Sequence, residues 1–167
     1  MRVKQLLILL VSVLAWQSCK IGYSFTGASL SPDVKTVSVD YFDNRSSLVN
    51  PGLSQNFTES LKDKFTSDAG LSLVSSGGDL EFKGYISAYS LTPVSIQQNE
   101  AAMMRLTISV QVEFKNNIDD KQSYSQTFSD FEDYNADSDF TSVEEELNRA
   151  ILEKLMEKIF LKSAANW

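Results

Sequence analysis

The sequence feature that most constrains the fold is the regular alternation of apolar and polar residues from position 104 to position 115. Every second position is apolar and every position between is polar, without exception. Because the side chains of a β-strand point alternately to opposite faces, this pattern predicts a half-buried antiparallel strand. About 11 residues of such a strand span about 36 Å. The apolar positions are Met104, Leu106, Ile108, Val110, Val112 and Phe114.

Two other stretches carry apolar residues at the four-residue spacing of an amphipathic helix. In the first, Asn50 is expected to be the N-cap and Pro51 the first helical residue, and the helix is expected to end near Gly70. The second begins with a capping box formed by Ser142 and Glu145 and is expected to run to about residue 161.

Shorter alternating stretches predict further strands at residues 34–42, 71–74, 80–91 and 123–129. The pair Gly77-Gly78 signals a hairpin turn, and Pro93 is expected to break the strand that precedes it. The acidic stretch 130–139 is interpreted as a solvated loop. The other interpretation is a calcium site, but the stretch lacks the glycine of the calcium-loop motif and its carboxylates are irregularly spaced.

The order of these elements is β-α-β-β-β-β-α, which predicts an α+β fold. We expect a two-layer sandwich, in which a mixed and mostly antiparallel sheet carries two helices on one face. The first strand, first helix and second strand are expected to form a right-handed crossover. No internal repeat is present, so residues 33–167 are interpreted as a single domain.

The N-terminal residues have the pattern of a secretory signal, which we assign to residues 1–18. A basic start precedes an apolar run that is too short to span a bilayer, and the small residue Ser18 ends it. Cys19, the only cysteine in the chain, follows directly. We expect Cys19 to be lipidated and residues 19–32 to form a tether, although Trp16 and Gln17 depart from the usual lipobox. The other interpretation is an ordinary secreted protein in which Cys19 is a chance cysteine.

Composition excludes several classes of function. The formal net charge of −7 argues against nucleic acid as a partner and against adsorption to an anionic membrane by charge alone. The chain contains no histidine, which is the usual general base and metal ligand. No phosphate-binding glycine motif is present. We therefore expect no enzymatic activity, no cofactor and no metal site.

If both helices cover one face of the sheet, the other face is left open and carries mostly uncharged polar side chains. One interpretation is a solvated face, because serine and threonine are tolerated on exposed strands. The other is a docking surface for a polar protein wall, such as the water-lined interior of an outer-membrane barrel. The residues predicted on this face include Tyr85, Tyr89, Thr107, Ser109, Gln111, Ser125 and Thr127.

The order and spacing of several short segments resemble the short form of the LptE family of lipopolysaccharide-assembly lipoproteins. The resemblance extends over essentially the whole chain after Cys19. Its segments are Tyr23-Ser24-Phe25-Thr26-Gly27-Ala28, Val37-Ser38-Val39-Asp40-Tyr41-Phe42, Asn50-Pro51, Leu53-Ser54-Gln55, Phe57-Thr58-Glu59, Leu61-Lys62-Asp63-Lys64-Phe65, Gly84-Tyr85-Ile86, Arg105-Leu106-Thr107-Ile108 and Asn166-Trp167.

The resemblance implies a lipoprotein on the periplasmic side of the Gram-negative outer membrane, anchored through acyl chains on Cys19. Such proteins plug the LptD barrel, assist its assembly and help to insert lipopolysaccharide into the outer leaflet. Family members engage lipopolysaccharide phosphates through basic residues at a strand end, and Arg105 is the nearest match here. Arg105 is otherwise interpreted as an ordinary strand-end arginine. The alternative function is a lipid-anchored periplasmic module that binds another envelope ligand.

Overall fold

The computed structural model describes residues 30–48, 50–94 and 103–164. The predicted signal sequence, Cys19 and the loop 95–102 lie outside these residues. The elements in chain order are β1 (Thr36–Val39), β2 (Asp43–Asn44), α2 (Leu53–Ser67), β3 (Ser72–Leu73), β4 (Leu80–Val94), β5 (Met103–Asn116), the 3₁₀ helix η1 (Asp120–Gln122), β6 (Tyr124–Asn135) and α3 (Phe140–Ala164).

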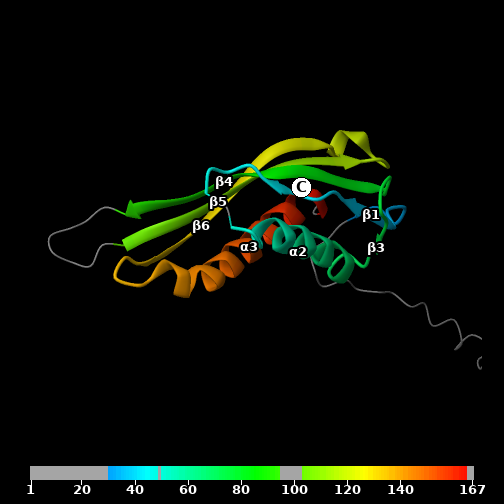
Figure 1. The fold of residues 1–167 in the computed structure, drawn as a ribbon. Coiled ribbons are helices and arrows are strands. Elements are labelled where there is room, and N and C mark those ends of the chain that lie inside the picture. The colour runs from blue at the N-terminus through cyan, green and yellow to red at the C-terminus, as the bar shows by residue number, and fades with distance from the viewer. Residues whose placement is uncertain (1–29, 49, 95–102, 165–167) are drawn as a thin grey trace, which may run out of the picture.

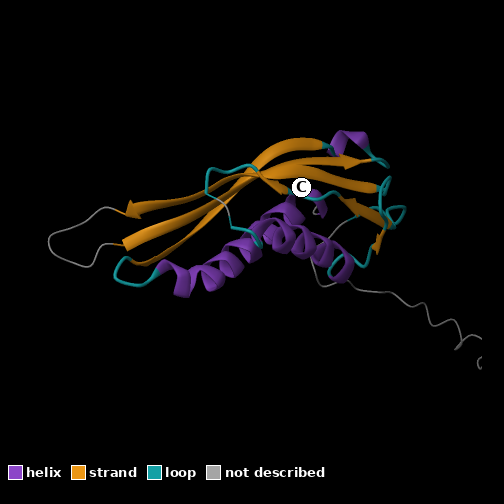
Figure 2. Ribbon diagram, in the orientation of Figure 1, coloured by secondary structure: helices purple, strands orange, loops and turns teal. Residues whose placement is uncertain are grey.

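The strands form one sheet in the order β3-β1-β4-β5-β6, and β2 pairs with β4. Long antiparallel pairings join β4 to β5 and β5 to β6, whereas β1 is parallel to both of its neighbours. Both α2 and α3 lie on one side of this sheet, and α3 runs along the long strands (Figures 1 and 2). This arrangement confirms the predicted two-layer α+β sandwich with a mixed sheet.

The core lies between the sheet and the helices, and aromatic rings connect its two layers. Phe65 of α2 packs 4.6 Å from Phe82 of β4, which in turn lies 4.9 Å from Phe114 of β5 (ring centroids). All three rings are buried. The apolar face of β5 is buried as its alternation predicts. Burial of the apolar side of the whole sheet beneath the two helices is the main source of stability.

The predicted hairpin at Gly77-Gly78 is wrong, because β3 and β4 lie on opposite sides of β1 and both run parallel to it. The carboxylate of Asp79 accepts hydrogen bonds from the backbone N–H groups of Lys35 and Thr36, each at 2.9 Å. These bonds lower the pKa of Asp79. A Cβ at Gly78 would lie 2.7 Å from the backbone nitrogen of Ser38, so only glycine permits the close approach of this loop to β1.

Two strand boundaries also differ from the prediction. Within the predicted strand 34–42 only β1 is a strand: it ends at Val39, and β2 begins at Asp43, beyond the predicted end. Between them, the buried Phe42 donates its N–H to Thr58 Oγ1 of α2 at 3.1 Å. Strand β4 continues through Pro93 instead of ending there. Beyond Ile86, no described strand pairs with the outer edge of β4, so the missing N–H of Pro93 removes no ladder hydrogen bond.

The first half of the acidic stretch 130–139 is strand and not loop, because β6 extends to Asn135.

Both helix caps also differ from the prediction. Helix α2 begins at Leu53, and the side chain of Asn50 instead accepts a hydrogen bond from Gly52 N–H at 3.0 Å in the preceding turn. Helix α3 begins at Phe140, with Ser142 already inside its first turn.

Candidate functional site

The uncovered face of the sheet carries a ladder of side-chain hydrogen bonds between β5 and β6. The Gln111 amide donates to Ser125 Oγ at 3.0 Å and accepts from Thr127 Oγ1 at 2.6 Å. One pair further along, Ser109 Oγ donates to Ser129 Oγ at 2.9 Å. Cross-strand neighbours on an antiparallel sheet are close enough for such bonds. The structure therefore places Ser109, Gln111, Ser125 and Thr127 together on the open face.

Two further predicted residues share this face. The Arg45 guanidinium lies 4.2 Å from the centroid of the Tyr85 ring, a cation–π contact over the open side of β4. Thr107 pairs with Phe131 of β6 across the ladder. The Phe131 side chain is 42% exposed, so this end of the open face carries an aromatic ring as well as hydroxyl groups.

Tyr89 does not lie on the open face, and this part of the prediction is wrong. The pairing of β4 with β5 shifts between Ile86 and Ala88, which marks a β-bulge at Ser87. One extra residue exchanges the two faces of the strand beyond it. Tyr89 therefore points toward the helices and is only 2% exposed.

The buried Tyr89 hydroxyl binds Glu144 of α3. It donates to Glu144 Oε1 at 2.6 Å, and the Asn50 amide donates to the same oxygen at 2.7 Å. Burial and the Glu144 carboxylate raise the pKa of Tyr89 well above its usual value. This cluster ties the sheet, the start of α3 and the turn before α2 together at one point.

Arg105 lies on the open face near the end of β5, where its guanidinium is engaged within the protein. Its Nε and Nη2 donate to the two carboxylate oxygens of Asp133 at 2.7 and 2.9 Å. The guanidinium carbon lies 3.6 Å from the centroid of the Phe131 ring. The carboxylate raises the pKa of Arg105, and the guanidinium lowers that of Asp133. An anion that binds Arg105 has to share it with Asp133.

Lysines of α3 cover the outer edge of β6, a feature that the sequence analysis missed. Lys158 donates to the backbone carbonyl of Ser129 at 2.9 Å and pairs with Asp130 at 2.7 Å. Lys154 donates to the carbonyl of Phe131 at 3.2 Å. Charged side chains on an edge strand oppose its pairing with another chain. The four-residue spacing of these lysines was the available sequence signal.

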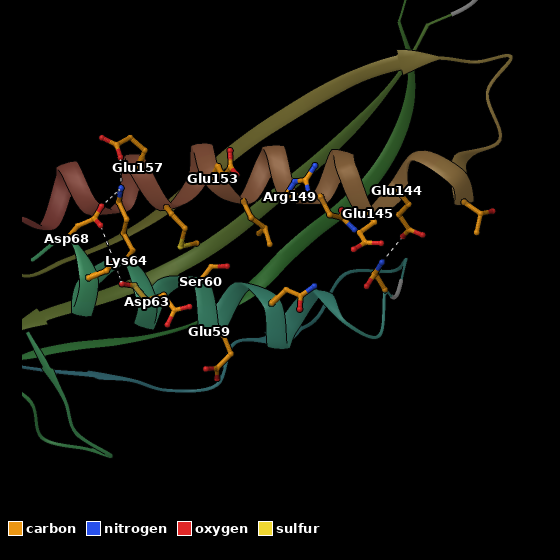
Figure 3. Close-up of a pocket in the computed structure, with 17 residues that line it drawn as sticks. Glu59, Ser60, Asp63, Lys64, Asp68, Glu144, Glu145, Arg149, Glu153 and Glu157 are labelled. Atoms are coloured by element: carbon orange, nitrogen blue, oxygen red, sulfur yellow. Dashed lines mark hydrogen bonds and ion pairs between the residues drawn. The ribbon is translucent and has the colours of Figure 1, made fainter. Parts of the chain in front are cut away.

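A groove of about 950 Å³ separates α2 from α3 on the opposite side of the molecule from the open face (Figure 3). It was also missed, although Glu145, Arg149, Glu153 and Glu157 recur at four-residue spacing along α3. Its lining includes seven carboxylate side chains and two cationic ones. They are Glu59, Asp63, Asp68, Glu144, Glu145, Glu153 and Glu157, with Lys64 and Arg149.

Within residues 30–48, 50–94 and 103–164, no group of three or more histidine, cysteine, aspartate or glutamate side chains is arranged to hold a metal ion. None of the helices in that part of the chain is both long enough and apolar enough to cross a membrane. Cys19, the predicted attachment point, lies outside these residues.

Comparison with known proteins gives one family and several similar folds. The model of the family described as LptE, lipopolysaccharide-assembly, matches residues 34–163. No curated protein matches the sequence. A minor lipoprotein from Acinetobacter baumannii is similar in structure, with 15% identity, a TM-score of 0.50, and coverage of 77% of this chain and 92% of that one. The hypothetical protein CT253 from Chlamydia trachomatis has 11% identity, a TM-score of 0.54, and coverage of 80% and 99%. At these identities the likeness is one of fold.

Proposed function

The chain belongs to the LptE family of lipopolysaccharide-assembly proteins, and we propose that it is the lipid-anchored plug of an LptD-type outer-membrane barrel. In this role it assists assembly of the barrel and helps to insert lipopolysaccharide into the outer leaflet. The family match covers the whole sandwich from before β1 to the last turn of α3. Membership of a lipopolysaccharide-assembly family favours a role that involves no enzymatic reaction.

The open sheet face is the observation that carries the docking proposal. Across its centre, the paired residues are Tyr85, Gln111 and Thr127 in one row and Ala88, Ser109 and Ser129 in the next. These six side chains carry no formal charge, and the Arg45 guanidinium lies over the Tyr85 ring at one end of the first row. The interior of a large outer-membrane barrel is polar and hydrated. A polar face can exchange its water for hydrogen bonds to such a wall, and burying it also requires a partner on the wall for the Arg45 guanidinium.

Anchoring supplies the second part of the proposal. Acyl chains on Cys19 would hold the protein at the periplasmic side of the outer membrane, since two or more chains give stable attachment. Arg105 is the proposed contact for lipopolysaccharide phosphates. Its guanidinium is fixed by Asp133 and Phe131, and N–H groups beyond the two that bind Asp133 remain as donors for a phosphate oxygen.

The test is co-purification after extraction of the full chain in mild detergent. A barrel protein of the LptD type should accompany the chain in near-equal amount. A chain that is recovered alone contradicts the plug and favours the alternative, a lipid-anchored module for another envelope ligand. The variant Cys19→Ala tests anchoring separately: it should leave the membrane fraction, and unchanged attachment would refute lipidation.

A further inference from the structure

The groove between α2 and α3 has an excess of negative charge that the protein itself does not neutralise. At one end, Lys64 of α2 pairs with Glu157 of α3 at 2.8 Å and with Asp68 at 2.7 Å (Figure 3). At the other end, Glu144 is held by Asn50 and the buried Tyr89. These contacts leave the middle of the groove to the remaining carboxylates and to one cation, Arg149, so the negative charge stays in excess there.

Three carboxylates in and beside this middle section make no ion pair with any residue that the structure describes. They are Asp63 of α2 and Glu145 and Glu153 of α3. Figure 3 shows Glu145 pointing from α3 toward α2. Like charges that share a groove repel one another, so a cationic occupant is favoured there.

Asn148 supplies an independent indication that the groove binds a hydrogen-bond donor. This residue lines the groove and is 7% exposed. Its side chain hydrogen-bonds the Tyr89 hydroxyl, but its Oδ1 has no hydrogen-bond partner among the described residues. An unsatisfied buried acceptor is uncommon in folded proteins and costs free energy. A donor from a bound molecule would satisfy it.

The floor of the groove determines what kind of donor fits. Leu152 and Met156 of α3 line it and are both buried, so apolar surface lies beneath the acidic rim. Lysine and arginine combine an aliphatic stem with a cationic N–H donor and match both parts. A metal ion matches neither the apolar floor nor the spread of the carboxylates, which form no three-membered ligand group in the described residues.

We propose that the groove between α2 and α3 binds a lysine- or arginine-bearing segment of the partner protein. The inference rests on the proposed function, because it takes the barrel as the source of that segment. It gives the sandwich two contact surfaces on opposite sides: a neutral polar sheet face and an acidic interhelical groove. The groove repels the phosphates of lipopolysaccharide, which therefore contacts the protein elsewhere.

The experiment compares full chains with charge reversals at adjacent positions of α3. Glu145→Lys places a cation in the groove, whereas Glu146→Lys reverses the same type of charge at an exposed residue that does not line it. Each protein is extracted in mild detergent, and the barrel that co-purifies is quantified. Like-charge contact in an interface costs several kcal/mol, so Glu145→Lys should retain at least tenfold less barrel than Glu146→Lys.

The outcomes separate this inference from the proposed function. Equal recovery of the barrel with wild type and both variants overturns the groove inference and leaves the plug intact. No recovery with any of the three, wild type included, overturns both. The neutral variants Glu145→Gln and Glu146→Gln control for misfolding, and both should give the circular dichroism spectrum of the wild type. In 0.3 M salt, Glu145→Gln should retain less barrel than Glu146→Gln. Equal losses of barrel from the two variants would contradict the groove inference.

Discussion

Replacement of Tyr89 by phenylalanine tests the β-bulge that separates the observed sheet from a regular one. The ring of Tyr89 is buried and its hydroxyl donates to the Glu144 carboxylate at 2.6 Å. Phenylalanine keeps the ring and removes only the donor. A hydrogen bond to a charged group contributes about 1.5–3 kcal/mol, and among the described residues the Glu144 side chain keeps only its bond from Asn50. We therefore expect the free energy of unfolding to fall by about 2 kcal/mol.

The assay is equilibrium unfolding in urea, followed by circular dichroism of the helices. With a slope of about 2 kcal/mol per molar urea, the midpoint should fall by about 1 M while the slope stays unchanged. Tyr85→Phe is the matched control, since Tyr85 precedes the bulge and lies on the open face, and its midpoint should shift by a quarter as much or less. Equal shifts for the two variants would refute the bulge, because regular alternation puts both tyrosines on one face.

Two other perturbations test the packing of the sheet and the burial of its aromatic residues. Gly84→Ala should destabilise the protein by about 3 kcal/mol or more, because its Cβ would overlap the Gln111 carbonyl oxygen, whereas Gly70→Ala meets no atom within 4 Å and should cost about 1–2 kcal/mol in the same urea assay. Burial raises the pKa of Tyr124 from 10.0 to about 12, so the folded state holds this proton more tightly than the unfolded chain. The contribution of this residue to stability should be unchanged up to about pH 9 and be lower by about 1.4 kcal/mol at pH 11, with most of the fall between pH 10 and 11. Tyr124→Phe should remove that part of the slope.

The fold class could be predicted because its main signals are local and repeated. The alternation along β5 and the four-residue spacing of the two helices predicted three elements that the structure contains, with small differences at their ends. The strand order could not be predicted from turn residues alone. Gly77-Gly78 resembles a hairpin turn in sequence, but the structure uses Gly78 to let a loop pass close to β1 and Asp79 to hold it there.

The open face was predicted correctly where the strands are regular and wrongly where they are not. Ser109, Gln111, Ser125 and Thr127 follow an unbroken period of two. The bulge at Ser87 exchanges the two faces of β4 beyond it. Its only sign in the sequence is that the large apolar residues shift from even-numbered positions, ending at Ile86, to the odd-numbered Tyr89 and Leu91. The groove depends on how two helices pack against each other, which the sequence of either helix alone does not determine.

Photo-crosslinking in cells at Thr127 tests most directly whether the open sheet face contacts a barrel wall. This residue is exposed on the ladder between β5 and β6. A photoreactive side chain at this position removes the hydrogen bond from Thr127 to Gln111 and leaves the core intact. We expect a crosslink from Thr127 to an LptD-type barrel, with a much lower yield from Ser76 in the exposed loop between β3 and β4. If the barrel co-purifies but Thr127 gives no crosslink to it, the sheet face is not the docking surface.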